Sequence, residues 1–200
     1  PASFKVSYLT MPPATLVTRL QQEMTANRVT VDIASIASPI WLTARIKEGK
    51  VMQYESPEHA AFAKAFSLGL GQKGYWAFNG AYFFAPMWNT DTLKFEGKSW
   101  KDAIKAAQPG RVSSGDPSRS DSILMTYIGL RSVVDLDSFK ELVGKKPNII
   151  YKSEQIASRL VTNEDLLGMF GMPTRAYQFN KKGAKLKVLQ PTEGVVLLPQ

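Results

Sequence analysis

Apolar residues recur along the chain with two alternating periods. Residues 4–8 alternate between apolar and polar side chains, as in a β-strand, and residues 16–24 then carry apolar side chains at helical spacing. The same order of strand and helix returns at 29–33 and 41–46. The pattern predicts a chain that begins with two β-α steps.

The same alternation continues to the end of the chain. Strands are predicted at 81–87, 111–114, 148–151, 166–170, 185–189 and 195–198, and helices within 60–70, 99–107, 122–133, 136–143 and 153–161. A polar segment is predicted over 171–175. Strands and helices in regular alternation favour α/β layers with mainly parallel strands. Ligands of such sheets bind beyond the carboxyl ends of the strands, so the loops at those ends are the first candidates for a functional site.

A few residues predict where these elements begin and end. Pro86 lacks a backbone N–H, which predicts that the far end of its strand lies at a sheet edge or exit. Ser99 and Asp102 have capping-box spacing and predict a helix start, with Asp in place of the usual Glu or Gln. Gly144 predicts the end of one helix, and Ser153 predicts the N-cap of the next.

Composition places the chain among folded globular proteins. Its 200 residues are 44% hydrophobic and 21% charged, and they include no cysteine, so disulfides and thiolate chemistry are excluded. The net charge of +8 predicts attraction of anions. Basic residues are scattered, however, and no nucleic-acid-binding module accompanies them, so nucleic acid is not an expected partner. No apolar run approaches the ~20 residues that span a bilayer, so direct membrane insertion is not expected.

One strand outlet carries the residues best suited to bind an anion. Directly before a predicted helix stand Ser118, Arg119, Ser120, Asp121 and Ser122. Hydroxyl groups, a guanidinium and the free N–H groups of a helix start are donors for a phosphonate, a carboxylate or a metal-bound anion. The alternative is structural: the pair Asp116–Pro117 forms a turn, and Ser120 or Asp121 only caps the helix.

Further candidate contacts lie on other segments. Ser35 and Ser38 follow the predicted strand at 29–33 and carry hydroxyl donors, although ordinary loop serines are an equal alternative. Trp88 can stack on a planar or cationic solute, or it packs in the core. Arg175 can clamp an anion, or it is a surface charge, and Tyr177 is near enough in sequence to act with it.

The chain lacks the residue sets that enzymes and metal sites require. His59 is the only histidine, which excludes a multi-histidine metal cluster, and it is expected on the surface or in a loop. No pair of carboxylates has a spacing diagnostic of acid–base catalysis. Gly69, Gly71 and Gly74 fit a nucleotide-binding spacing, but they follow a helical stretch instead of a strand, so the match is attributed to chance. We therefore expect neither an enzyme nor a bound cofactor.

Eight short segments, in order, resemble one protein family. They are 4–20, 31–38, 48–57, 75–76 followed by 83–90, 99–102, 115–118, 154–160 and 191–194. Together they resemble the bacterial extracellular solute-binding proteins of ABC transporters, in the group that carries iron, phosphonates or polyamines. Iron-carrying members present adjacent tyrosines where this chain has Pro173 and Thr174, so ferric iron held by such a pair is not expected.

The resemblance implies an α/β, two-lobe, periplasmic-binding-protein-like fold of type II, with mainly parallel sheets and helices on both faces. Domain one would comprise 1–84 and 191–200, and domain two 85–190, joined by crossover hinge strands near 81–88 and 189–195. The solute would bind in the cleft between the domains. The family's first strand and helix, and its closing helices, would lie outside this chain.

The resemblance also implies a function. The protein would be the periplasmic or cell-surface-anchored receptor of an ABC importer, made with a signal peptide, monomeric, and without a cofactor. Its partners would be a small, anionic solute and the permease subunits. The alternative is a ligand-sensing domain of a signalling or regulatory protein with the same fold.

Overall fold

A computed structural model describes residues 5–11, 13–78 and 80–199. The chain forms two compact units, Pro1–Ala77 and Phe78–Gln200. The predicted division into domains at 84 and 191 stays a prediction.

The first unit is mainly helical. Its elements are α1 (Pro13–Thr25), α2 (Pro39–Lys47), the 3-10 helix η1 (Pro57–Phe62), α3 (Ala63–Ser67) and a hairpin of β1 (Gly71–Gln72) and β2 (Trp76–Ala77). The helices predicted in this part of the chain are confirmed. Gly74 has a φ of +82° in the hairpin turn, a conformation that glycine adopts without a steric penalty.

The prediction of strands at 4–8 and 29–33 is wrong for residues 5–8 and 29–33. Phe4 lies outside the described residues. Neither segment forms regular structure, and the side chains of Tyr8 and Ile33 are 90% and 91% exposed. Alternation of apolar and polar side chains is not sufficient to form a strand. The backbone N–H and C=O groups also need a neighbouring strand, and neither segment has one among the described residues.

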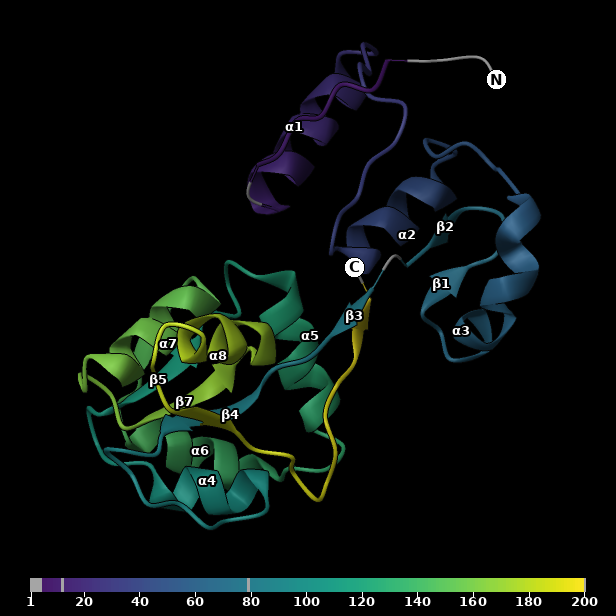
Figure 1. The fold of residues 1–200 in the computed structure, drawn as a ribbon. Coiled ribbons are helices and arrows are strands. Elements are labelled where there is room, and N and C mark those ends of the chain that lie inside the picture. The colour runs from purple at the N-terminus through teal and green to yellow at the C-terminus, as the bar shows by residue number, and fades with distance from the viewer. Residues whose placement is uncertain (1–4, 12, 79, 200) are drawn as a thin grey trace. The chain divides into compact units, whose positions relative to one another are not determined.

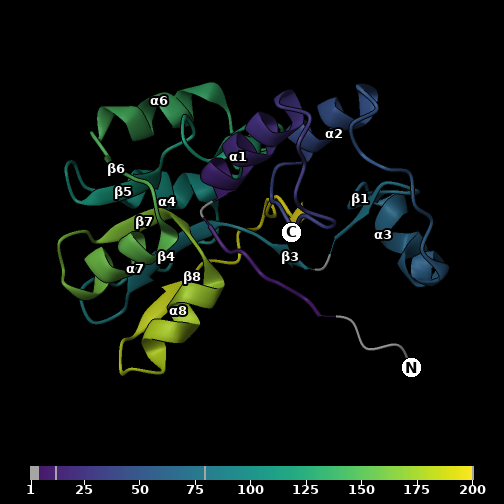
Figure 2. The same cartoon turned by 90° about the horizontal axis from the view of Figure 1, so that it is seen from above.

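The second unit contains a five-stranded sheet in the order β6-β5-β7-β4-β8 (Figure 2). The strands are β4 (Ala85–Asn89), β5 (Val112–Gly115), β6 (Asn148–Ile150), β7 (Leu167–Gly171) and β8 (Leu186–Val188). Strands β6, β5 and β7 are parallel, whereas β4 is antiparallel to both β7 and β8. The expected mainly parallel sheet is therefore corrected to a mixed one. The alternation of strands and helices predicts the elements but not the direction of β4. A single crossover helix makes the strands it joins parallel, and no such helix joins β4 directly to β7 or to β8.

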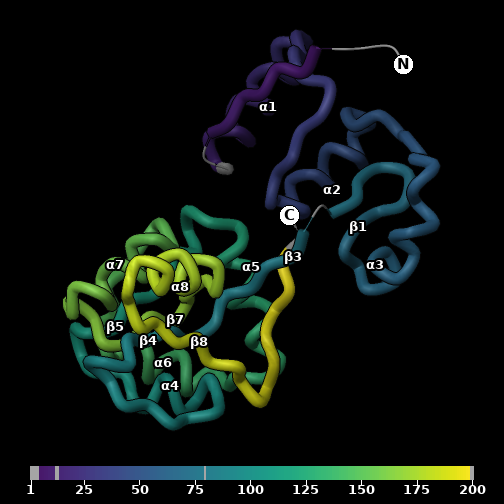
Figure 3. Tube along the Cα trace, viewed as in Figure 1, coloured from purple at the N-terminus to yellow at the C-terminus, as the bar shows by residue number. Residues whose placement is uncertain are grey.

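Strand β4 corrects the prediction for Pro86. All five residues of β4 are buried, and the strand lies inside the sheet between β7 and β8 instead of at an edge. In Figure 3 the teal β4 runs beside the yellow segment that carries β8. The pairing of β4 with β7 shifts register between Ala85 and Met87, so the missing N–H of Pro86 falls at an irregularity. The Pro86 carbonyl still accepts a hydrogen bond from Leu189 N, at 2.8 Å.

Helices cover both faces of this sheet (Figure 1). Helices α7 (Ser153–Val161) and α8 (Pro173–Asn180) lie on one face, and α4 (Trp100–Ala106) and α6 (Leu136–Gly144) lie on the other; α5 (Asp121–Leu130) contacts β9 (Leu198–Pro199). The layers enclose a core whose largest fully buried side chains include Trp100, Phe170, Met87, Ile104 and Leu160. Strand β9 begins later than the strand predicted at 195–198 and pairs antiparallel with β3 (Ala81–Tyr82).

Local signals at helix ends had mixed outcomes. The capping box is confirmed: Ser99 Oγ accepts from Asp102 N, and the Asp102 carboxylate accepts from Ser99 N. Gly144 is still helical, and Lys146 instead takes the left-handed conformation beyond the helix, at φ 52°. Ser153 is the first helical residue after the N-cap, not the cap itself. The polar segment expected at 171–175 contains the last residue of β7, the N-cap Met172 and the first turn of α8, with Pro173 at the first helical position.

Candidate functional site

The carboxyl edge of the parallel strands collects three loop-to-helix transitions. Strands β6, β5 and β7 end at Ile150, Gly115 and Gly171, and the chain then enters α7, α5 and α8 with N-cap residues Lys152, Ser120 and Met172. Because the three strands are parallel, their outlets lie at the same edge of the sheet. The first turns of the three helices leave backbone N–H groups unpaired and give this edge a positive electrostatic potential.

The outlet of β5 is held in a defined turn by Asp116. Its Oδ1 accepts hydrogen bonds from Ser118 N at 2.9 Å and from Ser118 Oγ at 2.7 Å. These two bonds, with the nearby Arg119, hold the pKa of Asp116 below its usual value. The turn that was an alternative interpretation is therefore present, and the Ser118 hydroxyl donates to the protein itself.

Arg119 joins the outlet of β5 to that of β6. Its guanidinium lies over the Tyr151 ring, 4.4 Å from the centroid, and its Nε is 3.9 Å from Asp116 Oδ2. Both contacts hold the side chain in place, yet 65% of it remains exposed. Arg119 can therefore offer N–H donors to a solute at this edge. Tyr151 was missed as a supporting residue, although its position at the end of a predicted strand was a usable signal.

The first turn of α5 carries the remaining predicted residues. Ser120 caps the helix, and its Oγ accepts from Ile123 N at 3.3 Å. Asp121 is the first helical residue and is exposed. The Ser122 hydroxyl is 2.5 Å from the Tyr82 hydroxyl, which reaches it from β3. Burial raises the pKa of Tyr82 above its usual value. Tyr82 was not among the predicted site residues, because its partner is 40 positions away in sequence.

Arg175 belongs to the same edge, whereas Trp88 does not. Arg175 is the third residue of α8; its Nη1 donates to Gln178 Oε1 at 2.8 Å, and its buried Nε has no hydrogen-bond partner within the described part of the chain. Tyr177 is 62% exposed, with Lys181 Nζ 4.8 Å from its ring centroid. Trp88 is only 3% exposed and packs edge-to-face on Phe95 at 5.0 Å. Its proposed role as a stacking contact is therefore corrected to core packing.

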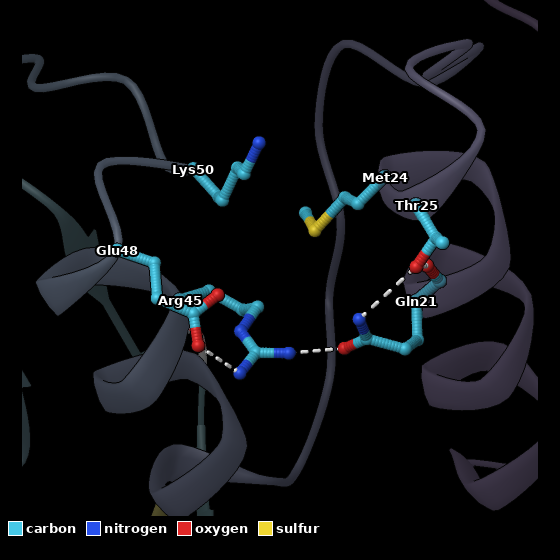
Figure 4. Close-up of a pocket in the computed structure, with 6 residues that line it drawn as sticks. All are labelled: Gln21, Met24, Thr25, Arg45, Glu48 and Lys50. Atoms are coloured by element: carbon cyan, nitrogen blue, oxygen red, sulfur yellow. Dashed lines mark hydrogen bonds and ion pairs between the residues drawn. The ribbon is translucent and has the colours of Figure 1, made fainter.

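Ser35 and Ser38 lie in the first unit. Ser35 is exposed in a segment without regular structure, while Ser38 is 3% exposed and is the N-cap residue of α2. Neither lines the polar pocket of about 190 Å³ between α1 and α2 that is lined by Gln21, Met24, Thr25, Arg45, Glu48 and Lys50 (Figure 4). Arg45 donates through Nη1 to Gln21 and through Nη2 to Glu48, so both terminal nitrogens of its guanidinium are engaged by the protein. Its buried Nε has no hydrogen-bond partner among the described residues. We do not assign a ligand to this pocket.

Metal-binding and membrane-spanning features are absent from the described residues. Across 5–11, 13–78 and 80–199, no three His, Cys, Asp or Glu side chains are grouped as metal ligands. No helix over the same residues has the length and apolar content to cross a bilayer. His59 was expected on the surface or in a loop, but it lies in the 3-10 helix η1 and is partly buried. Its side chain is 11% exposed and meets the Phe66 ring edge-on at 5.3 Å.

The second unit thus has a mixed five-stranded sheet, helices on both faces and three loop-to-helix transitions at the carboxyl ends of its parallel strands. The chain belongs to the family described as bacterial extracellular solute-binding protein, whose model matches residues 2–200. The resemblance seen in the sequence is thereby confirmed. The family consists of extracellular solute-binding proteins, in agreement with the expected location outside the cytoplasm and with the expectation of a binding protein instead of an enzyme.

Solved structures show the same fold. A substrate-binding protein of an ABC transporter from Agrobacterium tumefaciens matches with a TM-score of 0.78 and 14% identity, over 94% of this chain and 58% of that one. A ferric binding protein from Campylobacter jejuni matches with a TM-score of 0.72 and 16% identity, over 98% and 66% of the two chains. The periplasmic binding protein AfuA from Actinobacillus pleuropneumoniae, solved with fructose-6-phosphate, matches with a TM-score of 0.69 and 16% identity, over 96% and 63%.

The chain spans 58% to 66% of the length of these three proteins. A comparison with curated protein sequences finds no match. At these identities the structural likeness shows the fold and leaves the solute open.

Proposed function

We propose that this chain is part of the substrate-binding component of an ABC importer, which captures a small anionic solute and delivers it to the permease as a monomer. The observation that carries the proposal is the carboxyl edge of the sheet in the second unit. Three helix starts open there, and Arg119 and Arg175 stand beside them. Backbone N–H groups and guanidinium donors together replace the water around an anion.

Three observations support an oxyanion as the solute. The net charge is +8, which favours the approach of anions. AfuA, a protein of similar fold, was solved with a sugar phosphate bound. Pro173 and Thr174 begin α8 where a tyrosine pair would be needed to hold ferric iron, so a phosphonate, a phosphate ester or a carboxylate is the better-supported class.

The identity of the solute is tested by native mass spectrometry of the protein purified gently from its source, which should reveal a retained anion.

The site is tested by calorimetry with phosphate, sulfate and a sugar phosphate. Arg119→Ala should weaken binding about tenfold, because it removes charge-assisted donors. Arg131→Ala is the matched control, since Arg131 is at the opposite end of α5. Equal losses in both variants would show unspecific charge attraction and contradict the site.

A second candidate function is a sensing domain whose ligand signals to a regulatory partner. It is favoured by one structural likeness, to a two-component system protein that mediates signal transduction, with a TM-score of 0.64 and 11% identity. Sequencing the gene beyond this chain separates the two functions. A DNA-binding or kinase-linked segment would favour sensing, and adjacent permease genes would favour transport.

A further inference from the structure

Tyr82 reaches the candidate site from a strand that does not belong to the main sheet. Its hydroxyl is 2.5 Å from Ser122 Oγ in the first turn of α5. The Tyr82 ring meets Phe84 edge-on at 5.7 Å, and the Tyr82 backbone pairs with Leu198 of β9. The phenol is thus held by its ring, its backbone and its hydroxyl, so its oxygen has a defined position.

The chemistry of the two hydroxyls decides the direction of the hydrogen bond. A phenol is more acidic than an alkyl hydroxyl, so it is the better donor, and the serine oxygen is the better acceptor. Burial raises the pKa of Tyr82, which keeps the phenol protonated at neutral pH. Among the described residues, the hydrogen-bond partner of the Ser122 hydroxyl is Tyr82. If Tyr82 donates this bond, the hydroxyl hydrogen of Ser122 has no acceptor among the same residues.

We infer that Tyr82 is a positioning residue, which fixes the Ser122 oxygen and leaves its hydrogen to donate to the bound anion. The inference rests on the proposed function and adds a supporting residue to its site. Without the phenol, the Ser122 hydroxyl is free to rotate toward a nearby backbone carbonyl. When the Tyr82 hydroxyl donates to Ser122 Oγ, it also polarises the serine O–H. This strengthens the hydrogen bond that Ser122 donates to the anion.

A second tyrosine–serine pair in the same unit provides a matched control. Tyr127 and Ser114 are joined by a hydroxyl–hydroxyl hydrogen bond of 2.8 Å. Ser114 is 0% exposed inside β5, so its hydroxyl cannot touch a solute. Tyr127→Phe therefore removes the same kind of bond without changing a donor at the site. The Tyr127 ring is linked to that of Tyr82 through contacts with Phe170 and Phe84.

The test is a backbone-amide NMR titration of the 200-residue chain with inorganic phosphate and with sulfate, followed at residues 116–123. We expect Ser122→Ala to weaken binding about tenfold, and Tyr82→Phe about fivefold. The double variant should match Ser122→Ala alone, because Tyr82 acts through Ser122. Ser122→Thr should restore most of the affinity, and Tyr127→Phe should leave it within about twofold of the unmodified chain.

Thermal unfolding of each variant separates positioning from a structural role. A drop in melting temperature shared by Tyr82→Phe and Tyr127→Phe, with affinity unchanged in both, overturns the inference while the proposed function stands. Additive losses in the double variant also overturn it. If the unmodified chain shows no saturable shifts at 116–123 with either anion, the proposed function fails, and the inference fails with it.

Discussion

At the scale of single residues, the second unit buries one carboxyl group completely among its described residues, that of Asp165. It is 0% exposed, and its carboxylate accepts from Arg159 Nε at 2.6 Å and from Asn148 Nδ2 at 2.7 Å. Burial of a carboxylate is costly unless such partners replace its water. The three residues join α7, the start of β6 and the loop before β7, at the edge of the sheet opposite the candidate site. Their role is therefore in stability.

Asp165→Ala should lower the free energy of unfolding by about 3 kcal/mol, because it removes the buried acceptor of Arg159 Nε and Asn148 Nδ2. Urea denaturation measures the effect. Glu164→Ala is the control, since Glu164 pairs with the same Arg159 at 2.7 Å but is 53% exposed. We expect the control to cost less than about 1 kcal/mol. Equal costs would contradict the importance of burial.

At the scale of elements, helix α7 packs on β7 at a point where only glycine fits. A Cβ placed on Gly168 would come within 2.3 Å of Ile156 Cγ2, which belongs to α7. Ile156 is 1% exposed and Leu160 is 0% exposed, so neither can move aside without disturbing the core. Gly168 also pairs with Ser113 in the parallel ladder between β5 and β7.

Gly168→Ala should therefore destabilise the protein by about 2 kcal/mol through overpacking. Gly144→Ala is the matched control, because nothing lies within 4 Å of its added Cβ and the residue is helical. Replacing a helical glycine by alanine should stabilise by up to about 1 kcal/mol. Chemical denaturation of both variants measures the change in the free energy of unfolding, which should be negative for Gly168→Ala and positive for Gly144→Ala. A loss in the control as large as that in Gly168→Ala would refute the steric explanation.

At the scale of the whole molecule, carboxylates of the second unit make its stability depend on pH. Asp102 accepts from the backbone of Lys98, Asp116 from Ser118, and Asp135 from Lys101, and each pKa lies below the usual 3.8. A carboxyl group with a lowered folded-state pKa stabilises the fold above its ordinary pKa. This contribution is lost as pH falls through the folded-state value.

We predict that the urea midpoint is nearly constant between about pH 5 and pH 7 and falls steeply below about pH 4. The aspartate-to-asparagine triple variant at 102, 116 and 135 should be less stable at pH 7 but should lose less stability on acidification. Asp137→Asn is the control, because Asp137 is 87% exposed and its ion pair is with the exposed Lys140. An unchanged acid slope in the triple variant would show that other groups govern acid unfolding.

Much of the second unit was predictable because its signals are local. Periodicity located β5, β6, β7 and the helices between them, and the capping box at Ser99 was read correctly, since each signal depends on residues within a few positions of one another. The loop 118–122 was also found in this way. A polar segment between a strand and a helix in an α/β chain has few other places to lie than at the carboxyl edge of the sheet.

Features that depend on residues far apart in sequence could not be predicted from the sequence. The alternating segments at 4–8 and 29–33 needed a pairing strand to become strands, the direction of β4 depended on β7 and β8, and the burial of Trp88 depended on the layers around it. The Tyr82–Ser122 bond joins residues that no local pattern relates. Local periodicity selects the type of element, because it acts through nearest neighbours. Partners, direction and burial are decided only when the chain packs, because they depend on contacts between segments far apart in sequence.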